Sequence, residues 1–489
     1  MPQFGETHDD SIYYVSAKSL AEGGGYRIPS LPAEPFQTKY PPGYSWLLAL
    51  AWLIEPRFPA NLQYAMLLNW LVFPAFLALS YLWLRRTARP LVSTALIALN
   101  PYLILFSTYM MSELLFGALI LAALVLSRRV LIAALLGAAA YLVRTGGVVL
   151  AAAGALSFWQ EGRRRDAIFF GAIFVPFVAG WMYWARTHQD PGTDIVTMYY
   201  TNYLGYRIQS VPLNEFHLFV WKNLDGVLWG IGSLFIPRIL DSLLIKILSQ
   251  TLAVAAIIGV CRMAKRPEIR PFVYFSALYV MILLVWHYPP NERFMLPLFP
   301  LLMAGFLAEM ERFWRGIVAG FRHPDRSQRA AGWIIGGVFA AVILGAAVSQ
   351  VITLTTMMPA MLDMQRSRTG AQREAYAWIN QNLPPQANVM AAMDPTLYLY
   401  TNRHSCQLIV PTIHWYRDDP KGALKHYEDL VGYARKQRME YLYLGYKDYS
   451  RDMAEEDHKD VIRVMKESKA LKLLKEFKTG GIYRIEGGQ

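Results

Sequence analysis

Long apolar runs alternate with short polar connections between positions 60 and 356. A bilayer core of about 30 Å takes roughly 20 apolar residues per helix. The pattern predicts membrane spans at 60–84, 91–106, 113–127, 130–143, 147–158, 167–186, 239–260, 271–287, 294–312 and 332–356. Several of these runs are short, so 130–143 and 147–158 are interpreted as one broken or re-entrant element around residues 144–147.

Beyond position 356 the apolar residues come in shorter runs and charged residues become frequent. Here the periodicity predicts helices at 372–382, 424–437 and 461–469, strands at 388–392, 407–410 and 440–445, and a hairpin over 472–486 around Gly480 and Gly481. The predicted fold class is a multi-pass α-helical membrane protein of about ten spans with a small C-terminal soluble α/β domain. Its predicted parts are an external loop at 1–59, a helical membrane domain at 60–356 and an external domain at 357–489.

Composition and charge agree with this class. Of 489 residues, 54% are hydrophobic and 17% are charged, whereas soluble domains average about 25% charged. These values exclude a disordered chain, a disulfide-stapled secreted domain and an ordinary cytosolic enzyme. The net charge of +12 does not indicate a nucleic-acid partner, because the basic residues gather in alternate loops, as the positive-inside rule describes for cytoplasmic loops. Those loops lie at 85–89, 128–129, 163–165, 262–270 and 315–329. The first segment, the loop 187–238 and the tail are therefore predicted to be external.

Candidate functional residues gather in the predicted external segments and at the outer ends of the predicted spans. Ionisable side chains are costly at an apolar boundary, so they are functional candidates. The set comprises Asp9, Asp10, Tyr13, Lys39, Tyr44, Glu113, Arg144, His287, Glu292 and Arg293. Structural interpretations stay open: the acidic pair could cap a helix, Lys39 could be a solvated interfacial lysine, the arginines could snorkel to headgroups, and Glu113 could favour the dipole of the helix that it begins.

The ordered set of motifs resembles the GT-C superfamily of membrane glycosyltransferases, in the branch of protein O-mannosyltransferases and the lipid A aminoarabinose transferase. Those enzymes carry an acidic pair followed by Tyr and a spaced Ala, Leu and Gly, and then a Lys- and Pro-containing block that ends in Gly-Tyr. Here these blocks are 9–13 with Ala17, Leu20 and Gly23, and 39–44. Weaker similarities lie at 111–113, 142–144, 292–300 and 377–385. Two features depart from the family: a helix expected before the acidic pair is missing, and Asp10 stands where Glu is usual.

The resemblance implies an inverting transferase that moves a sugar from a polyprenyl-phosphate donor to an acceptor on the extracytoplasmic side, in a bacterial inner membrane. Attack by a hydroxyl needs a base, and the departing phosphate needs cations. The resemblance assigns Asp9 as the base, Asp10 as its positioning neighbour, and Lys39 with Arg144 and Arg293 to the donor phosphate. Glu113 would line the same cavity. The remaining candidates are assigned to substrate binding.

The cofactor and the acceptor stay open at this stage. No cofactor is required by the sequence, and a divalent cation is left open, although this branch generally works without one. Membrane lipids are expected partners, and a glycan, a lipid or a protein could each be the acceptor. Tyrosines at 199, 200, 203 and 206 and Trp221 suit stacking on sugar rings or an interfacial belt equally well. The rival functions are a transporter or flippase of lipid-linked precursors and a non-catalytic binder of lipid-linked sugars.

Overall fold

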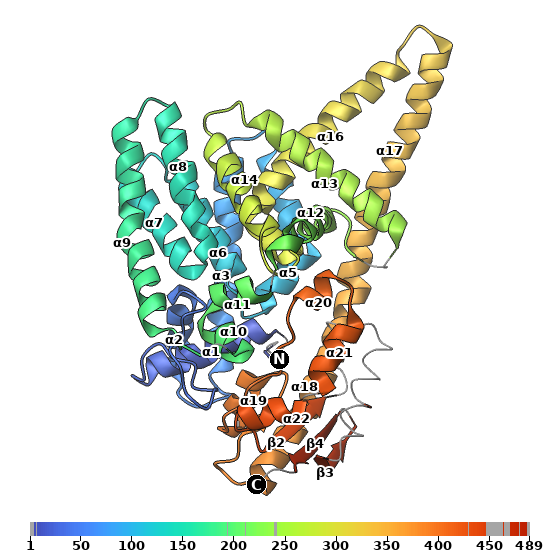
Figure 1. Ribbon diagram of the computed structural model, residues 1–489. Coiled ribbons are helices and arrows are strands. Elements are labelled where there is room, and N and C mark those ends of the chain that lie inside the picture. Colours follow the sequence, from blue (N-terminus) through green and yellow to red (C-terminus); the bar gives the residue numbers. More distant parts are fainter. Residues whose placement is uncertain are drawn as a thin grey trace. The chain divides into compact units, whose positions relative to one another are not determined.

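In the computed structural model the chain is mostly helical (Figure 1). It forms two compact units. The structure describes residues 4–5, 7–192, 194–210, 212–238, 242–428, 430–445, 463, 470–478 and 480–486. The first unit combines residues 1–68, 180–218 and 362–489, and the second combines 69–179 and 219–361. The domain boundaries expected at 59 and 356 stay predictions.

The second unit holds the apolar helices. They are α3 (Leu62–Leu84), α4 (Pro90–Ala98), α5 (Pro101–Thr108), α6 (Glu113–Val125), α7 (Val130–Val143), η1 (Thr145–Val148), α8 (Val149–Gln160), α9 (Arg164–His188), α12 (Phe216–Ser233), α13 (Leu243–Met263), α14 (Arg270–Leu284), α15 (Glu292–Met295), η3 (Leu296–Leu298), α16 (Phe299–Phe321), α17 (Arg326–Ile352) and η4 (Thr353–Met357). The ends of α3, α9 and α12 extend into the first unit.

Each predicted span falls on one to three of these helices, but the expected count of about ten is not confirmed. Five helical segments among the described residues are long and apolar enough to cross a membrane, and α4 with α5 would make a sixth as a pair bent by 56°. The others, such as α6, α7 and α14, are shorter apolar helices. At the break predicted around residues 144–147, α7 ends at Val143 and η1 separates it from α8; that the two helices form one broken or re-entrant element stays a prediction.

Small residues allow helices of the second unit to approach closely. A Cβ atom placed on Gly259 of α13 would lie 2.0 Å from the backbone oxygen of Gly305 in α16. On the other side of this unit, Gly137 of α7 and Gly154 of α8 make room for the rings of Phe174 and Phe170, and Figure 1 shows α7, α8 and α9 side by side. Close backbone packing at small residues is the usual way in which helices associate in a bilayer.

The first unit contains the short helices before and between the membrane segments together with the C-terminal domain. Its elements are α1 (His8–Ala21), α2 (Gly43–Ile54), α10 (Ile195–Thr201), α11 (Tyr203–Ser210), η2 (Leu213–Glu215), α18 (Met358–Asn382), β1 (Val389–Met390), α19 (Asp394–Thr401), α20 (Ile413–Tyr416), α21 (Pro420–Glu428), α22 (Leu430–Lys436), β2 (Tyr441–Gly445), β3 (Leu471–Phe477) and β4 (Gly480–Ile485).

A four-stranded sheet in the order β1-β2-β4-β3 organises this unit. β1 runs parallel to β2, and the other neighbours are antiparallel, with Leu442 opposite Tyr483. Successive side chains of a strand point to opposite faces, so Leu442 and Tyr443 belong to different cores. Ala375 and Ile379 of α18 cover one face. The other core includes residues of α1, α10, α11 and α22.

The predictions for the tail are confirmed in part. The strand at 440–445 and the hairpin over 472–486 are present, although Gly480 begins β4 instead of forming the turn. The strand predicted at 407–410 is wrong. Its backbone follows β1 only as far as Cys406, and the hydroxyl of Tyr433 donates to the carbonyl oxygen of Gln407 at 2.8 Å, which occupies a group that a ladder would use. The helix predicted at 461–469 lies outside the described residues, apart from Arg463.

Candidate active site

The first acidic residue of the pair, Asp9, is hydrogen-bonded to Tyr40 of the block 39–44. Asp9 lies in the first turn of α1, and the hydroxyl of Tyr40 donates to its Oδ1 at 2.5 Å. Burial and the nearby charge of Asp9 raise the pKa of Tyr40 well above its ordinary value, so the phenol keeps its proton and remains a donor. Such a charge-assisted bond fixes the direction of the carboxylate. The acidic block 9–13 and the block 39–44 therefore meet at Asp9 and Tyr40.

The second acidic residue caps the helix. Thr7 is the N-cap of α1, and Asp10 at the third helical position completes a capping box by accepting from the backbone nitrogens of Thr7 and Gly5 at 3.5 and 3.1 Å. Asp10 is fully buried, and burial raises its pKa to about 8. At neutral pH it is therefore mostly protonated. The helix-cap interpretation of the acidic pair holds for Asp10, and its neutral carboxyl spares Asp9 a repulsive charge.

Lys39 lies in a cage of aromatic rings, which we call the tyrosine cage: Tyr40, Tyr199 and Tyr203. Its Nζ is 3.4 Å from the ring centre of Tyr199, 4.7 Å from that of Tyr203 and 5.1 Å from that of Tyr40. The lysine is only 7% exposed, so it is not a solvated surface residue. Aromatic faces attract a cation most strongly where water is excluded. Tyr199 of α10 and Tyr203 of α11 thereby supply much of the surroundings of this lysine.

Tyr13 and Tyr44 form the packing beneath this arrangement. The ring of Tyr13 lies 4.8 Å from that of Tyr40 and meets the ring of Tyr44 edge-on at 5.0 Å. Both side chains are buried. A contact of either ring with substrate stays a prediction; in this structure they support the position of Tyr40.

A buried carboxylate that the sequence did not reveal lies against the start of the same helix. Nε2 of His8 is 2.7 Å from Oδ1 of Asp394, the first residue of α19, and 3.3 Å from the hydroxyl of Tyr200. Burial raises the pKa of the fully buried Asp394, and His8 opposes that effect. The sequence signal at Asp394 was only an acid before a proline, which is typical of any helix start.

In the second unit, Glu113 joins two of the predicted arginines. Its side chain is 1% exposed and begins α6, and its Oε1 accepts from Nη1 of Arg144 at 2.6 Å and from Nε of Arg293. Arg144 is presented by the end of α7 at the break, and it also donates to Ser112 at 3.1 Å. We call Glu113, Arg144 and Arg293 the arginine clamp. With two guanidinium groups and one carboxylate, the arginine clamp carries a net charge of +1.

The two other predicted residues of this unit make different contacts. Glu292 faces Arg238 at 3.7 Å. His287 is buried, with its ring 5.0 Å from that of Trp286 and 5.2 Å from that of Tyr288. Their assignment to substrate binding stays a prediction.

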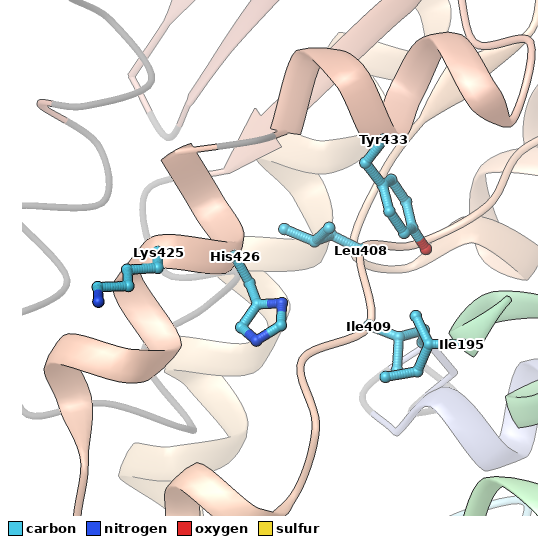
Figure 2. Close-up of a pocket in the computed structure, with 6 residues that line it drawn as sticks. All are labelled: Ile195, Leu408, Ile409, Lys425, His426 and Tyr433. Atoms are coloured by element: carbon cyan, nitrogen blue, oxygen red, sulfur yellow. The ribbon is translucent and has the colours of Figure 1, made fainter. Parts of the chain in front are cut away.

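A separate cavity of about 260 Å³ lies in the first unit beside α10, α21 and α22. Figure 2 shows its lining, which consists of Ile195, Leu408, Ile409, Lys425, His426 and Tyr433. None of the predicted site residues is among them. Among the described residues, no three His, Cys, Asp or Glu side chains gather in a way that could hold a metal ion.

Comparison with known proteins shows a similarity of fold to solved structures. No protein-family model and no curated protein matches the sequence. The crystal structure of ArnT from Cupriavidus metallidurans bound to undecaprenyl phosphate is similar with a TM-score of 0.50 and 12% identity, over 98% of this chain and 95% of that one. Its apo form gives a TM-score of 0.47 and 12% identity, over 98% and 94%. The resemblance stated from the sequence is thus confirmed at the level of the fold, which is that of a multi-pass membrane protein.

Proposed function

We propose that the protein is an inverting glycosyltransferase that moves a sugar from a polyprenyl-phosphate donor to an acceptor hydroxyl on the extracytoplasmic face of the membrane. The observation that carries the proposal is the arrangement at α1, where an oriented carboxylate, Asp9, lies in the same cluster of side chains as the caged cation Lys39. The likeness in fold to ArnT, which was crystallised with undecaprenyl phosphate, supports a donor of that class.

The proposed reaction joins the acceptor oxygen to the anomeric carbon of the sugar. The bond from that carbon to the phosphate oxygen breaks, its electron pair leaves with the phosphate, and the proton of the acceptor hydroxyl passes to Asp9. Asp9 suits this role because Tyr40 directs one of its oxygens and the neutral Asp10 adds no competing charge. A positioned base contributes roughly 10² to 10⁴ in rate.

Cations are needed where the polyprenyl phosphate departs. We assign Lys39 and the two guanidinium groups of the arginine clamp to the donor phosphate. A planar guanidinium matches the geometry of phosphate oxygens, and Glu113 brings the two guanidinium groups together by accepting from both. In this proposal Glu113 holds the two arginines in place, and the tyrosine cage limits the positions of the lysine.

The test follows release of polyprenyl phosphate from a panel of polyprenyl-phosphate sugars by the purified protein. We expect release from one donor, and a loss of about 10² to 10⁴ in rate in Asp9→Asn. Asp363→Asn is the matched control, because that carboxylate is 74% exposed in a surface pair with Arg366, and it should retain the full rate. An Asp9→Asn protein as fast as the unmutated one would show that Asp9 is not the base.

A further inference from the structure

The first turn of α1 is joined to the C-terminal domain through a buried polar contact. His8 is the first residue of this helix and directly precedes Asp9. Its ring contacts Asp394 and Tyr200, and its side chain is 14% exposed while that of Asp394 is fully buried. The first residue of the helix that carries the proposed base, His8, therefore contacts the carboxylate of Asp394 in the C-terminal domain.

Stability alone is a poor explanation for this contact. Removing an acid and a base from water is costly, and apolar residues of similar volume often replace such a buried pair with no loss of stability. α1 is also anchored without the pair, because Ile12 and Val15 lie in the apolar core that includes Met390 and Leu442 of the C-terminal sheet. What the apolar contacts do not supply is a directional bond at the first turn, where Asp9 lies.

His8 is also linked to Lys39, through the ring of Tyr199. The ring of His8 lies 6.0 Å from that of Tyr199 and 5.8 Å from that of Tyr200, and Tyr199 provides the nearest face of the tyrosine cage. His8 thus belongs to the helical turn that carries Asp9, and its ring also lies against Tyr199, the nearest ring to Lys39. A shift of His8 would displace the first turn of α1, whereas the lysine is also held by Tyr40 and Tyr203.

We propose that His8 and Asp394 are positioning residues, through which the C-terminal domain holds the first turn of α1 so that Asp9 faces the acceptor. This role rests on the proposed transferase function. Neither residue touches the reacting atoms in the proposal. A misplacement of about 1 Å at a reacting group can cost about 100-fold in rate, so a bond of this kind is sufficient to matter.

The test measures kcat and KM for the donor in Asp394→Leu, in His8→Leu and in the double variant. We expect each of the three to lose about 10- to 100-fold in kcat, with KM for the donor within about 3-fold. The double variant separates positioning from stability: its apolar pair should recover the thermal midpoint lost in the single variants, while its kcat stays low. A double variant with the unmutated kcat would overturn the proposal.

Glu34→Gln is the matched control. Glu34 pairs with His404 at 3.3 Å in the same unit, but both side chains are substantially exposed, and kcat should not change. Hydrogen exchange of the backbone at residues 7–13 gives a readout that needs no donor. It should accelerate in Asp394→Leu and not in Glu34→Gln.

The two readouts separate failure of this proposal from failure of the transferase. An active unmutated protein with unchanged kcat in Asp394→Leu leaves the transferase standing and overturns the positioning role. An unmutated protein that is silent with every donor overturns both; the exchange result then decides only whether Asp394 orders the first turn of α1.

Discussion

Asp10 should make the stability of the fold depend on pH. Its pKa is raised from 3.8 to about 8 by burial, so between these values the folded chain keeps a proton that the unfolded chain loses. Stability therefore falls as pH rises through this window, and the contribution levels off above about pH 8. The slope of one such group is at most about 1.4 kcal/mol per pH unit, which amounts to about 3 kcal/mol between pH 5 and pH 7.

The assay is thermal unfolding in detergent, followed by the fluorescence of the 14 tryptophans, at several pH values from 5 to 8. Asp10→Asn keeps an oxygen for the nitrogens of Gly5 and Thr7 but cannot titrate, so its midpoint should fall less steeply with pH. A residual slope of the same sign is expected from Asp394, whose pKa is also raised by burial. Glu22→Gln, at the exposed end of the same helix, should keep the full slope. Identical slopes in Asp10→Asn and the unmutated protein would refute the reasoning.

Three further predictions concern the charged groups. Glu113→Gln leaves two arginines without their buried counter-ion and should lower the free energy of unfolding by about 3–5 kcal/mol. Glu311→Gln is the control: Glu311 lies in a more exposed pair with Arg315, and its loss should lower the free energy of unfolding by less than about 1 kcal/mol. Chemical denaturation of the two variants compares these values. Tyr199→Leu should cost about 1–2 kcal/mol by removing the nearest face of the tyrosine cage, and Tyr199→Phe should restore most of it in the same measurement. Lys39→Met should raise KM for the polyprenyl-phosphate donor in the release assay, and an unchanged KM would remove the lysine from the phosphate site.

The parts of the fold that depend on neighbouring residues could be predicted from the sequence. The break after Val143 is an example. A Cβ atom on Gly147 would lie 2.6 Å from the backbone nitrogen of Tyr141, so a glycine is required there, and the glycines at 146 and 147 indicated an interruption in an apolar run. The meeting of the acidic pair with the lysine block was also expected, although the pattern did not show that Tyr40 makes the contact with Asp9.

Other parts depend on residues that are far apart, and no local pattern encodes them. The clamp joins Glu113 to Arg293 across 180 positions, and each residue taken alone fits a helix terminus or a membrane boundary. Asp9 and Asp10 differ in how far their side chains are buried. Two adjacent residues of the same type do not reveal this difference in the sequence. The strand expected at 407–410 had a suitable apolar pattern, but the hydroxyl of Tyr433 takes one of the carbonyl oxygens that a strand would need.

The contact between His8 and Asp394 spans 386 positions, and this separation has a consequence for biosynthesis. A ribosome makes the helix that carries Asp9 before the apolar helices α3 to α17, but the carboxylate that holds it emerges only after those helices have been translated. The proposed active site is therefore completed last, once α19 has folded against α1. A product that stops short of α19 would contain its apolar helices and both acidic residues, yet it would lack the partner of His8 and should show at least the loss of about 10- to 100-fold in kcat that is expected for Asp394→Leu.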